Sequence, residues 1–197
     1  MVRTAILAAA MFTVAQGVAQ AQESQFRCPA PGTVVEQSTG GRLVYRGQDA
    51  NDPLVCTMTN GERRAFGYWA AGSTFYRSGR AQLARLVSGG VSEGREERFD
   101  YFSPGRDSNS VHFYEAWRVA GAGPVQVVAG TLDALRMERR VHIPNTAYSY
   151  IETVWLDRGS GAPIKVHVDH LNGFMPASLT SWEATEIRTA LPRPSGS

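Results

Sequence analysis

The sequence contains little cysteine and lysine, and it lacks the common catalytic motifs. Of its 197 residues only Cys28 and Cys56 are cysteines, and only Lys165 is a lysine. No C-x-x-C pair is present and no histidine lies near either cysteine in the sequence, which argues against a thiol nucleophile. The motifs G-x-S-x-G and H-E-x-x-H, the P-loop, and G-x-G-x-x-G before a helix are also absent. These absences argue against the usual hydrolase, metalloprotease and nucleotide-binding classes.

The formal charge is close to balance, with 20 Lys and Arg against 18 Asp and Glu. This balance offers no electrostatic basis for nucleic-acid binding, so we expect no nucleic-acid partner. Nearly every positive charge is an arginine. A GC-rich coding bias explains this composition, and arginine-based recognition of anions is the alternative.

The histidines and carboxylates form no convincing site. His167 and His170 are three residues apart in a predicted strand, where side chains alternate between faces, so a shared metal is disfavoured. Glu152 and Asp169 are expected to oppose each other across neighbouring strands, beside His167, in a polar ladder typical of a solvent face. We therefore expect no catalytic residue, cofactor or metal, and a hydrolase of unrecognised type that uses these three residues is the alternative.

The first 21 residues have the three parts of a secretory signal peptide. A basic start that includes Arg3 precedes the apolar stretch 4–18, and Ala19-Gln20-Ala21 has the A-x-A cleavage pattern. The stretch is shorter than the roughly 20 apolar residues of a membrane span, although an uncleaved anchor is the alternative. We predict cleavage after Ala21 and a mature protein without a membrane span, in the periplasm or outside the cell.

Two cysteines in an exported chain indicate one disulfide, Cys28–Cys56. This bond would stabilise the fold by about 2–4 kcal/mol. Two free thiols are the alternative.

Residues 22–70 are predicted to form a loop-rich, disulfide-bearing N-terminal part. Short strand candidates are Thr33–Val35, Arg42–Arg46 and Leu54–Met58, and Asn60-Gly61 is a strong hairpin dipeptide. The aromatic residues in 66–69 and 73–76 are expected to serve the core. A helix of about two turns is predicted over Arg80–Val87. The mixed charges in Glu93–Arg98 indicate a solvated loop or sheet edge.

Residues 99–187 have the pattern of an antiparallel meander. In 111–119 and 131–143, apolar and polar side chains alternate with the period of a half-buried strand, and Ile164–Asp169 is the clearest example. Glu115 interrupts one apolar face, so it is expected to pair with an arginine or to mark the mouth of a cavity. The fold class is therefore mainly β: one domain over 22–190, a curved antiparallel sheet in a half-barrel or partial barrel with one short helix, followed by a frayed tail, 191–197.

Three runs carry a resemblance to a known group of proteins. They are V-Q-V-V-A-G-T-L-D-A-L-R-M over 125–137, E-T-V-W-L-D over 152–157 and P-I-K-V over 163–166. These runs resemble a pattern of bacterial exported proteins of unknown function, whose domain is similar to the β half-barrel of periplasmic lipoprotein carriers. The resemblance covers about residues 99–187 and implies a curved sheet around helices and an apolar cavity, without implying an activity.

The function that follows is non-enzymatic. We expect an exported protein that binds a lipid or another hydrophobic or amphiphilic ligand in the concavity of the sheet, because such hollows are common ligand sites. The ligand wall would be formed by Phe113, Trp117, Leu135, Met137 and Trp155, unless these side chains fill a dry core. An interaction or structural module with an envelope protein as its partner is the second hypothesis.

Overall fold

The protein is described by a computed structural model that covers residues 26–88, 93–105, 109–172 and 179–189. The predicted signal peptide, 1–21, and the tail, 191–197, lie outside these residues. The described chain forms strands β1 (Val34–Gln37), β2 (Arg42–Gln48), β3 (Val55–Met58), β4 (Arg63–Ala65), β5 (Trp69–Ala70), β6 (Glu96–Pro104), β7 (Ser110–Val127), β8 (Gly130–His142), β9 (Ser149–Asp157), β10 (Pro163–His170) and β11 (Trp182–Arg188), and helix α1 (Thr74–Val87).

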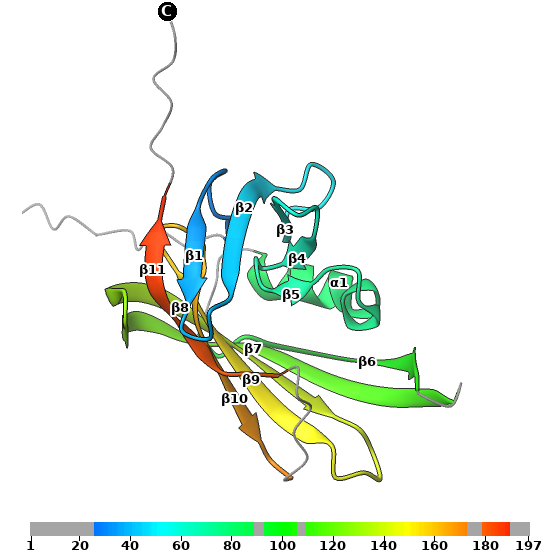
Figure 1. The fold of residues 1–197 in the computed structure, drawn as a ribbon. Coiled ribbons are helices and arrows are strands. Elements are labelled where there is room, and N and C mark those ends of the chain that lie inside the picture. The colour runs from blue at the N-terminus through cyan, green and yellow to red at the C-terminus, as the bar shows by residue number, and fades with distance from the viewer. Residues whose placement is uncertain (1–25, 89–92, 106–108, 173–178, 190–197) are drawn as a thin grey trace, which may run out of the picture.

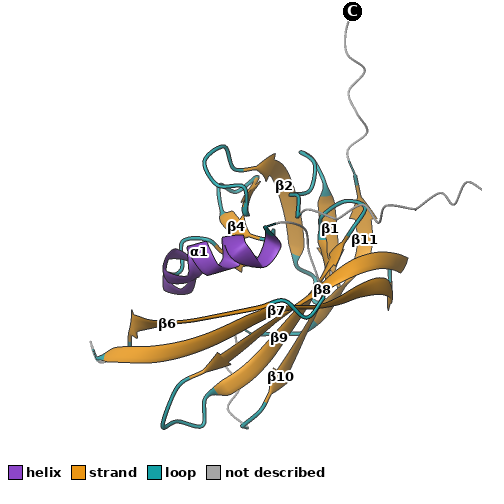
Figure 2. Ribbon diagram, turned by 180° about the vertical axis from the view of Figure 1, so that it is seen from behind, coloured by secondary structure: helices purple, strands orange, loops and turns teal. Residues whose placement is uncertain are grey.

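The strands form one antiparallel sheet in the order β5-β4-β3-β2-β1-β11-β10-β9-β8-β7-β6. The sheet has two arms, the N-terminal arm of β1–β5 and a fan of β6–β10. Strand β11 joins them, because Trp182 and Glu183 pair with β10 while residues from Ala184 onward pair with β1. Figure 1 shows β1, β2 and β11 rising from the fan of β6–β10, and in Figure 2 helix α1 lies between the two arms. The sheet is not closed. The predicted mainly β, antiparallel fold with one helix and one disulfide is confirmed.

Alternation of side chains explains the long strands of the fan. In β10, Ile164, Val166 and Val168 are buried. The alternate residues His167 and Asp169 are exposed. Strands β7 and β8 alternate in the same way, and the apolar residues face the side on which α1 lies. We call this side the inner face and the opposite side the outer face.

Helix α1 is longer than the sequence predicted. It begins at Thr74 rather than Arg80, because Phe75, Tyr76, Gly79 and Leu83 recur at helical spacing and are all buried. Gly79 allows the close approach to β6, since a Cβ placed there would lie 2.1 Å from the Phe99 ring. Among the described residues, no helix is long and apolar enough to cross a membrane.

The charged run expected to be a loop or an edge contributes an edge strand, β6. Glu97 points to the inner face, where its carboxylate accepts a hydrogen bond of 2.9 Å from Arg85 of α1. Phe99, two residues further, is buried beneath the helix. Glu97 and Phe99 of this edge strand therefore hold α1 on the sheet.

The predicted disulfide is formed between Cys28 and Cys56, with an S–S distance of 2.04 Å and a Cα–Cα distance of 5.4 Å. Cys56 lies in β3, so the bond fastens the start of the described chain to the N-terminal arm. Phe26 lies nearby, with its ring edge-on to Phe66 at 5.1 Å.

Candidate functional site

A buried charge network lies on the inner face of the sheet. It links three neighbouring strands, β7, β8 and β9. Arg139 of β8 donates hydrogen bonds of 2.9 and 2.6 Å to the two carboxylate oxygens of Glu115 on β7. It also donates a longer bond of 3.5 Å to Glu152 on β9. The Arg139 side chain is 9% exposed and the two carboxylates are enclosed. The expectation that Glu115 pairs with an arginine is confirmed.

Aromatic side chains supply the remaining donors. Glu115 accepts hydrogen bonds from the Tyr101 hydroxyl at 2.8 Å and from the Trp117 indole at 2.7 Å. Glu152 accepts hydrogen bonds from Tyr68 at 3.0 Å and from Trp69 at 2.6 Å. Tyr68 and Trp69 belong to the N-terminal arm, so this network fastens that arm to the fan.

The network also keeps Arg139 charged. Burial opposes its charged form, but the carboxylates of Glu115 and Glu152 outweigh this cost and raise the pKa of the guanidinium. The guanidinium carbon lies 4.1 Å from the centre of the Phe75 ring and 5.5 Å from that of Trp117, within the range of cation–π attraction. With its carboxylates occupied by internal donors, the network has the properties of a structural element.

The predicted ligand-wall residues lie in three different environments. Trp117, Leu135 and Met137 are buried in the hydrophobic core on the inner face. Phe113 is half-buried on the same face and stacks on Tyr101, with ring centres 5.2 Å apart. Trp155 lies on the outer face, beside Lys165. The five side chains therefore do not line one cavity.

The residues suggested for a hydrolase are also separated. Glu152 lies opposite Val168, not Asp169, and it is 1% exposed. His167 and Asp169 are on the solvent side, where their side chains are 2.9 Å apart. The prediction that Glu152 and Asp169 share a solvent-facing ladder is wrong, because Glu152 follows the alternation of the buried face.

A groove of about 1180 Å³ opens beside α1. One wall is the helix face that carries Arg80, Ala84 and Val87, which are spaced by four and three residues. Leu54 lines it from the β2–β3 connection, and Phe26 lines it near the disulfide. The groove therefore has an apolar lining beside the helix.

The charged side chains that line this groove are three arginines and two aspartates: Arg27, Arg80, Arg158, Asp133 and Asp157. Arg27 donates hydrogen bonds to the carbonyls of Arg158 and Gly159, and Arg158 pairs with Asp133 at 2.9 Å. On the helix side, Arg80 pairs with Asp52 at 2.7 Å and remains half exposed. An apolar groove with arginines at its rim can accommodate an anionic amphiphile.

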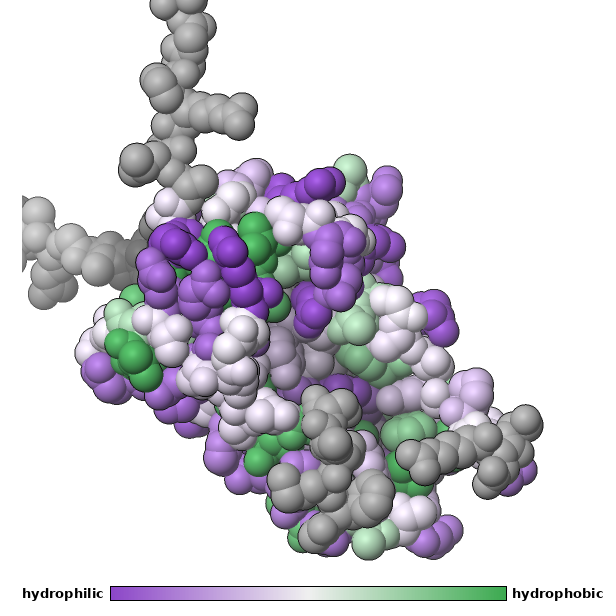
Figure 3. Space-filling model, viewed as in Figure 1, coloured by the Kyte–Doolittle hydropathy of each residue, from purple (hydrophilic) through white to green (hydrophobic). Residues whose placement is uncertain are grey.

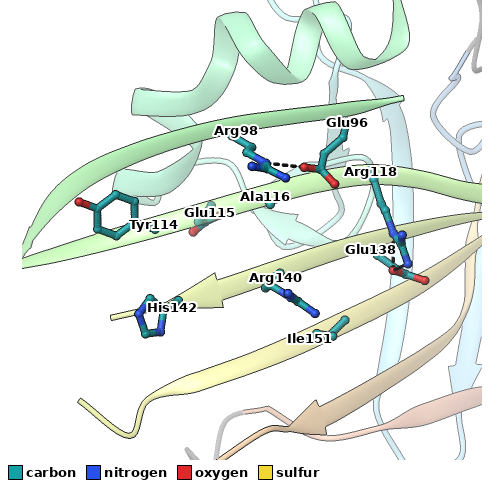
Figure 4. Close-up of a pocket in the computed structure, with 10 residues that line it drawn as sticks. All are labelled: Glu96, Arg98, Tyr114, Glu115, Ala116, Arg118, Glu138, Arg140, His142 and Ile151. Atoms are coloured by element: carbon teal, nitrogen blue, oxygen red, sulfur yellow. Dashed lines mark hydrogen bonds and ion pairs between the residues drawn. The ribbon is translucent and has the colours of Figure 1, made fainter. Parts of the chain in front are cut away.

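A second hollow, of about 410 Å³, lies on the outer face of β6–β9 (Figure 4). Cross-strand pairing places Arg98, Ala116, Arg140 and Ile151 in one row across the four strands. Ala116, the smallest of the four, separates the two arginines. This hollow was not anticipated, because its residues come from four strands and register is not visible in the sequence.

Exposed apolar side chains are few on the described surface. The large ones are Phe102, Tyr114, Val128 and Leu171. On the face shown in Figure 3, apolar residues form small separate patches among hydrophilic ones. Within the described residues, no group of three or more His, Cys, Asp and Glu side chains could hold a metal ion.

Comparison with known proteins identifies no family. No family model matches the chain, and no curated protein matches it. Among solved structures, the hypothetical lipoprotein YmcC from Escherichia coli (K12) is similar, with a TM-score of 0.39 and 11% sequence identity. The match covers 71% of this chain and 79% of that one. So distant a likeness says nothing of what this chain binds.

Proposed function

We propose that this chain is an exported, non-enzymatic protein that binds an anionic amphiphile in the groove beside α1. The observation that carries the proposal is the combination of about 1180 Å³ of open volume, apolar side chains beside the helix, and three arginines against two aspartates in the lining. The inner face beneath the helix is filled by the protein's own side chains, such as Trp117 and Met137, so an amphiphile would be held in the groove and not beneath the helix.

Export is supported by the Cys28–Cys56 disulfide, since such bonds persist in oxidising compartments. Together with the A-x-A leader, it supports a location of the mature protein in the periplasm or outside the cell. A non-enzymatic role is supported by the buried state of Glu152, which is separated from His167 and Asp169.

The test is a fluorescence titration of the mature protein with 11-(dansylamino)undecanoic acid, an anionic amphiphilic probe. Ala84→Glu places a carboxylate in the groove, while Ala81→Glu places the same group on an exposed position of the same helix. We expect saturable binding of the probe to the wild type and to Ala81→Glu. The affinity of Ala84→Glu for the probe should be lower by about tenfold or more, because the carboxylates of the variant and of the probe repel each other.

Dansylamide, which lacks the acyl chain, should bind much more weakly. Equal affinity of both variants for the amphiphilic probe would show that the groove is not its site. The absence of saturable binding to the wild-type protein would overturn the proposal itself.

A second candidate is a protein-interaction module of the cell envelope. It is favoured by the open edges of the sheet at β5 and β6, whose unpaired backbone groups can accept a further strand. Crosslinking in intact cells, followed by identification of a reproducible partner that pairs at one of these edges, would support it.

A further inference from the structure

The outer-face hollow differs from the groove in its position and in its chemistry. It is lined by Glu96 and Arg98 of β6, Tyr114 and Arg118 of β7, and Arg140 of β8. Figure 4 shows these side chains around the small Ala116, which leaves the centre of the hollow open. The surrounding larger residues stand on neighbouring strands, which run roughly 4.8 Å apart.

The arginines of this hollow differ in how they are paired. Arg98 is bound to Glu96, and Arg118 is bound to Glu138 at 2.6 Å. Within the part of the chain that the structure describes, Arg140 has no hydrogen-bond or ion-pair partner. One guanidinium in the hollow is therefore available to an external anion.

The carboxylate of Glu115 does not neutralise this guanidinium. Although Glu115 borders the hollow, its side chain lies on the inner face and is bound to Arg139. The side chains that face the hollow thus include three arginines and two glutamates, which leaves an excess of one positive charge.

Next to the arginine row lies an aromatic surface. Tyr114 is 46% exposed, and its ring centre is 4.4 Å from that of His112, which stacks in turn on Phe102. Tyr114 is two residues from Ala116 on the same strand, a rise of about 7 Å. A ligand that places an oxyanion at Arg140 can therefore place an attached ring against Tyr114.

We propose that the outer-face hollow binds an organic oxyanion, a carboxylate or phosphate group attached to a ring. Arg140 is the residue that recognises the anion, Arg98 supports it across Ala116, and Tyr114 contacts the ring. Guanidinium groups match both oxyanions in charge and in hydrogen-bond geometry. The site is separate from the groove beside α1 and does not depend on the function proposed for that groove.

The experiment is an NMR and calorimetric titration of the mature protein with phenyl phosphate, benzoate, inorganic phosphate and benzyl alcohol. We expect saturable binding of phenyl phosphate or benzoate, weaker binding of inorganic phosphate, and no binding of neutral benzyl alcohol. The tighter of the two ring-bearing anions identifies the oxyanion. Shifts should concentrate at Ala116, Tyr114 and Arg140.

Arg140→Met should weaken binding about tenfold or more, which is the effect of losing one charged hydrogen bond. Arg46→Met is the matched control, because Arg46 is an exposed arginine on β2, also without an ion pair among the described residues. Ala116→Leu should block the hollow without a change of charge. Ala84→Glu should bind these anions like the wild type, which distinguishes this site from the groove.

Two outcomes would overturn the proposal. One is the absence of saturable binding of both ring-bearing anions. The other is an equal loss of affinity in Arg140→Met and Arg46→Met, which would mean that the anions respond only to net charge.

Discussion

Replacement of Arg139 by methionine tests the role of the buried network. The substitution keeps an unbranched side chain but leaves Glu115 and Glu152 without their cation. Removing one partner of a buried ion pair typically costs about 3–5 kcal/mol, because the remaining charge stays desolvated. The two short hydrogen bonds to Glu115 and the 9% exposure of Arg139 place this case within that range.

The neighbouring residue provides the control. Arg140 is on the same strand but points to the outer face, so Arg140→Met should change the free energy of unfolding by less than about 0.5 kcal/mol. Urea denaturation, followed by tryptophan fluorescence and circular dichroism, measures both variants. Equal stabilities of Arg139→Met and Arg140→Met would refute the reasoning.

A combined variant separates loss of charge balance from loss of packing. When Arg139→Met is joined to Glu115→Gln and Glu152→Gln, no unpaired charge remains in the core. Most of the lost stability should then return, since a buried network can often be replaced by neutral groups at little cost. A triple variant less stable than Arg139→Met would mean that packing, not charge, dominates.

Three further predictions concern the scaffold. Cys28→Ser should lower the free energy of unfolding by about 2–4 kcal/mol in urea titrations, and the wild type should release no thiol when denatured without reductant. Gly79→Ala should destabilise by about 1–3 kcal/mol, because the new methyl group would overlap Phe99, whereas Ser78→Ala on the exposed side of α1 should be nearly neutral. Burial opposes ionisation of Asp52, but hydrogen bonds and a nearby arginine lower its pKa, so its stabilisation is present above about pH 4 and lost as the pH falls further. Asp52→Asn should therefore flatten the loss of stability below about pH 4 in acid titrations.

Local patterns in the sequence predicted much of the fold. Alternation over Ile164–Asp169 corresponds to β10, and the glutamate that interrupts the apolar face at Glu115 proved to be paired with an arginine. The start of α1 was missed because Phe75 and Tyr76 were interpreted as a separate aromatic cluster rather than as the first turn of the helix. Local patterns detect periodicity, but they do not show which neighbouring segments share it.

The candidate sites were harder to predict, since they depend on long-range pairing. Besides the bond from Arg139, Glu152 receives hydrogen bonds from Tyr68 and Trp69, which are 84 and 83 residues away. A glutamate in an apparent polar ladder gives no sign of such donors. The arrangement of Arg98 and Arg140 on either side of Ala116 likewise follows from strand register alone.

The most direct test of the proposed function is native mass spectrometry of the mature protein purified from the periplasm without detergent. We predict an additional mass of an anionic amphiphile on the wild type and on Ala81→Glu, and its absence from Ala84→Glu. A wild-type protein that carries no additional mass and binds no amphiphilic probe, or an Ala84→Glu variant that retains the ligand, would contradict the account.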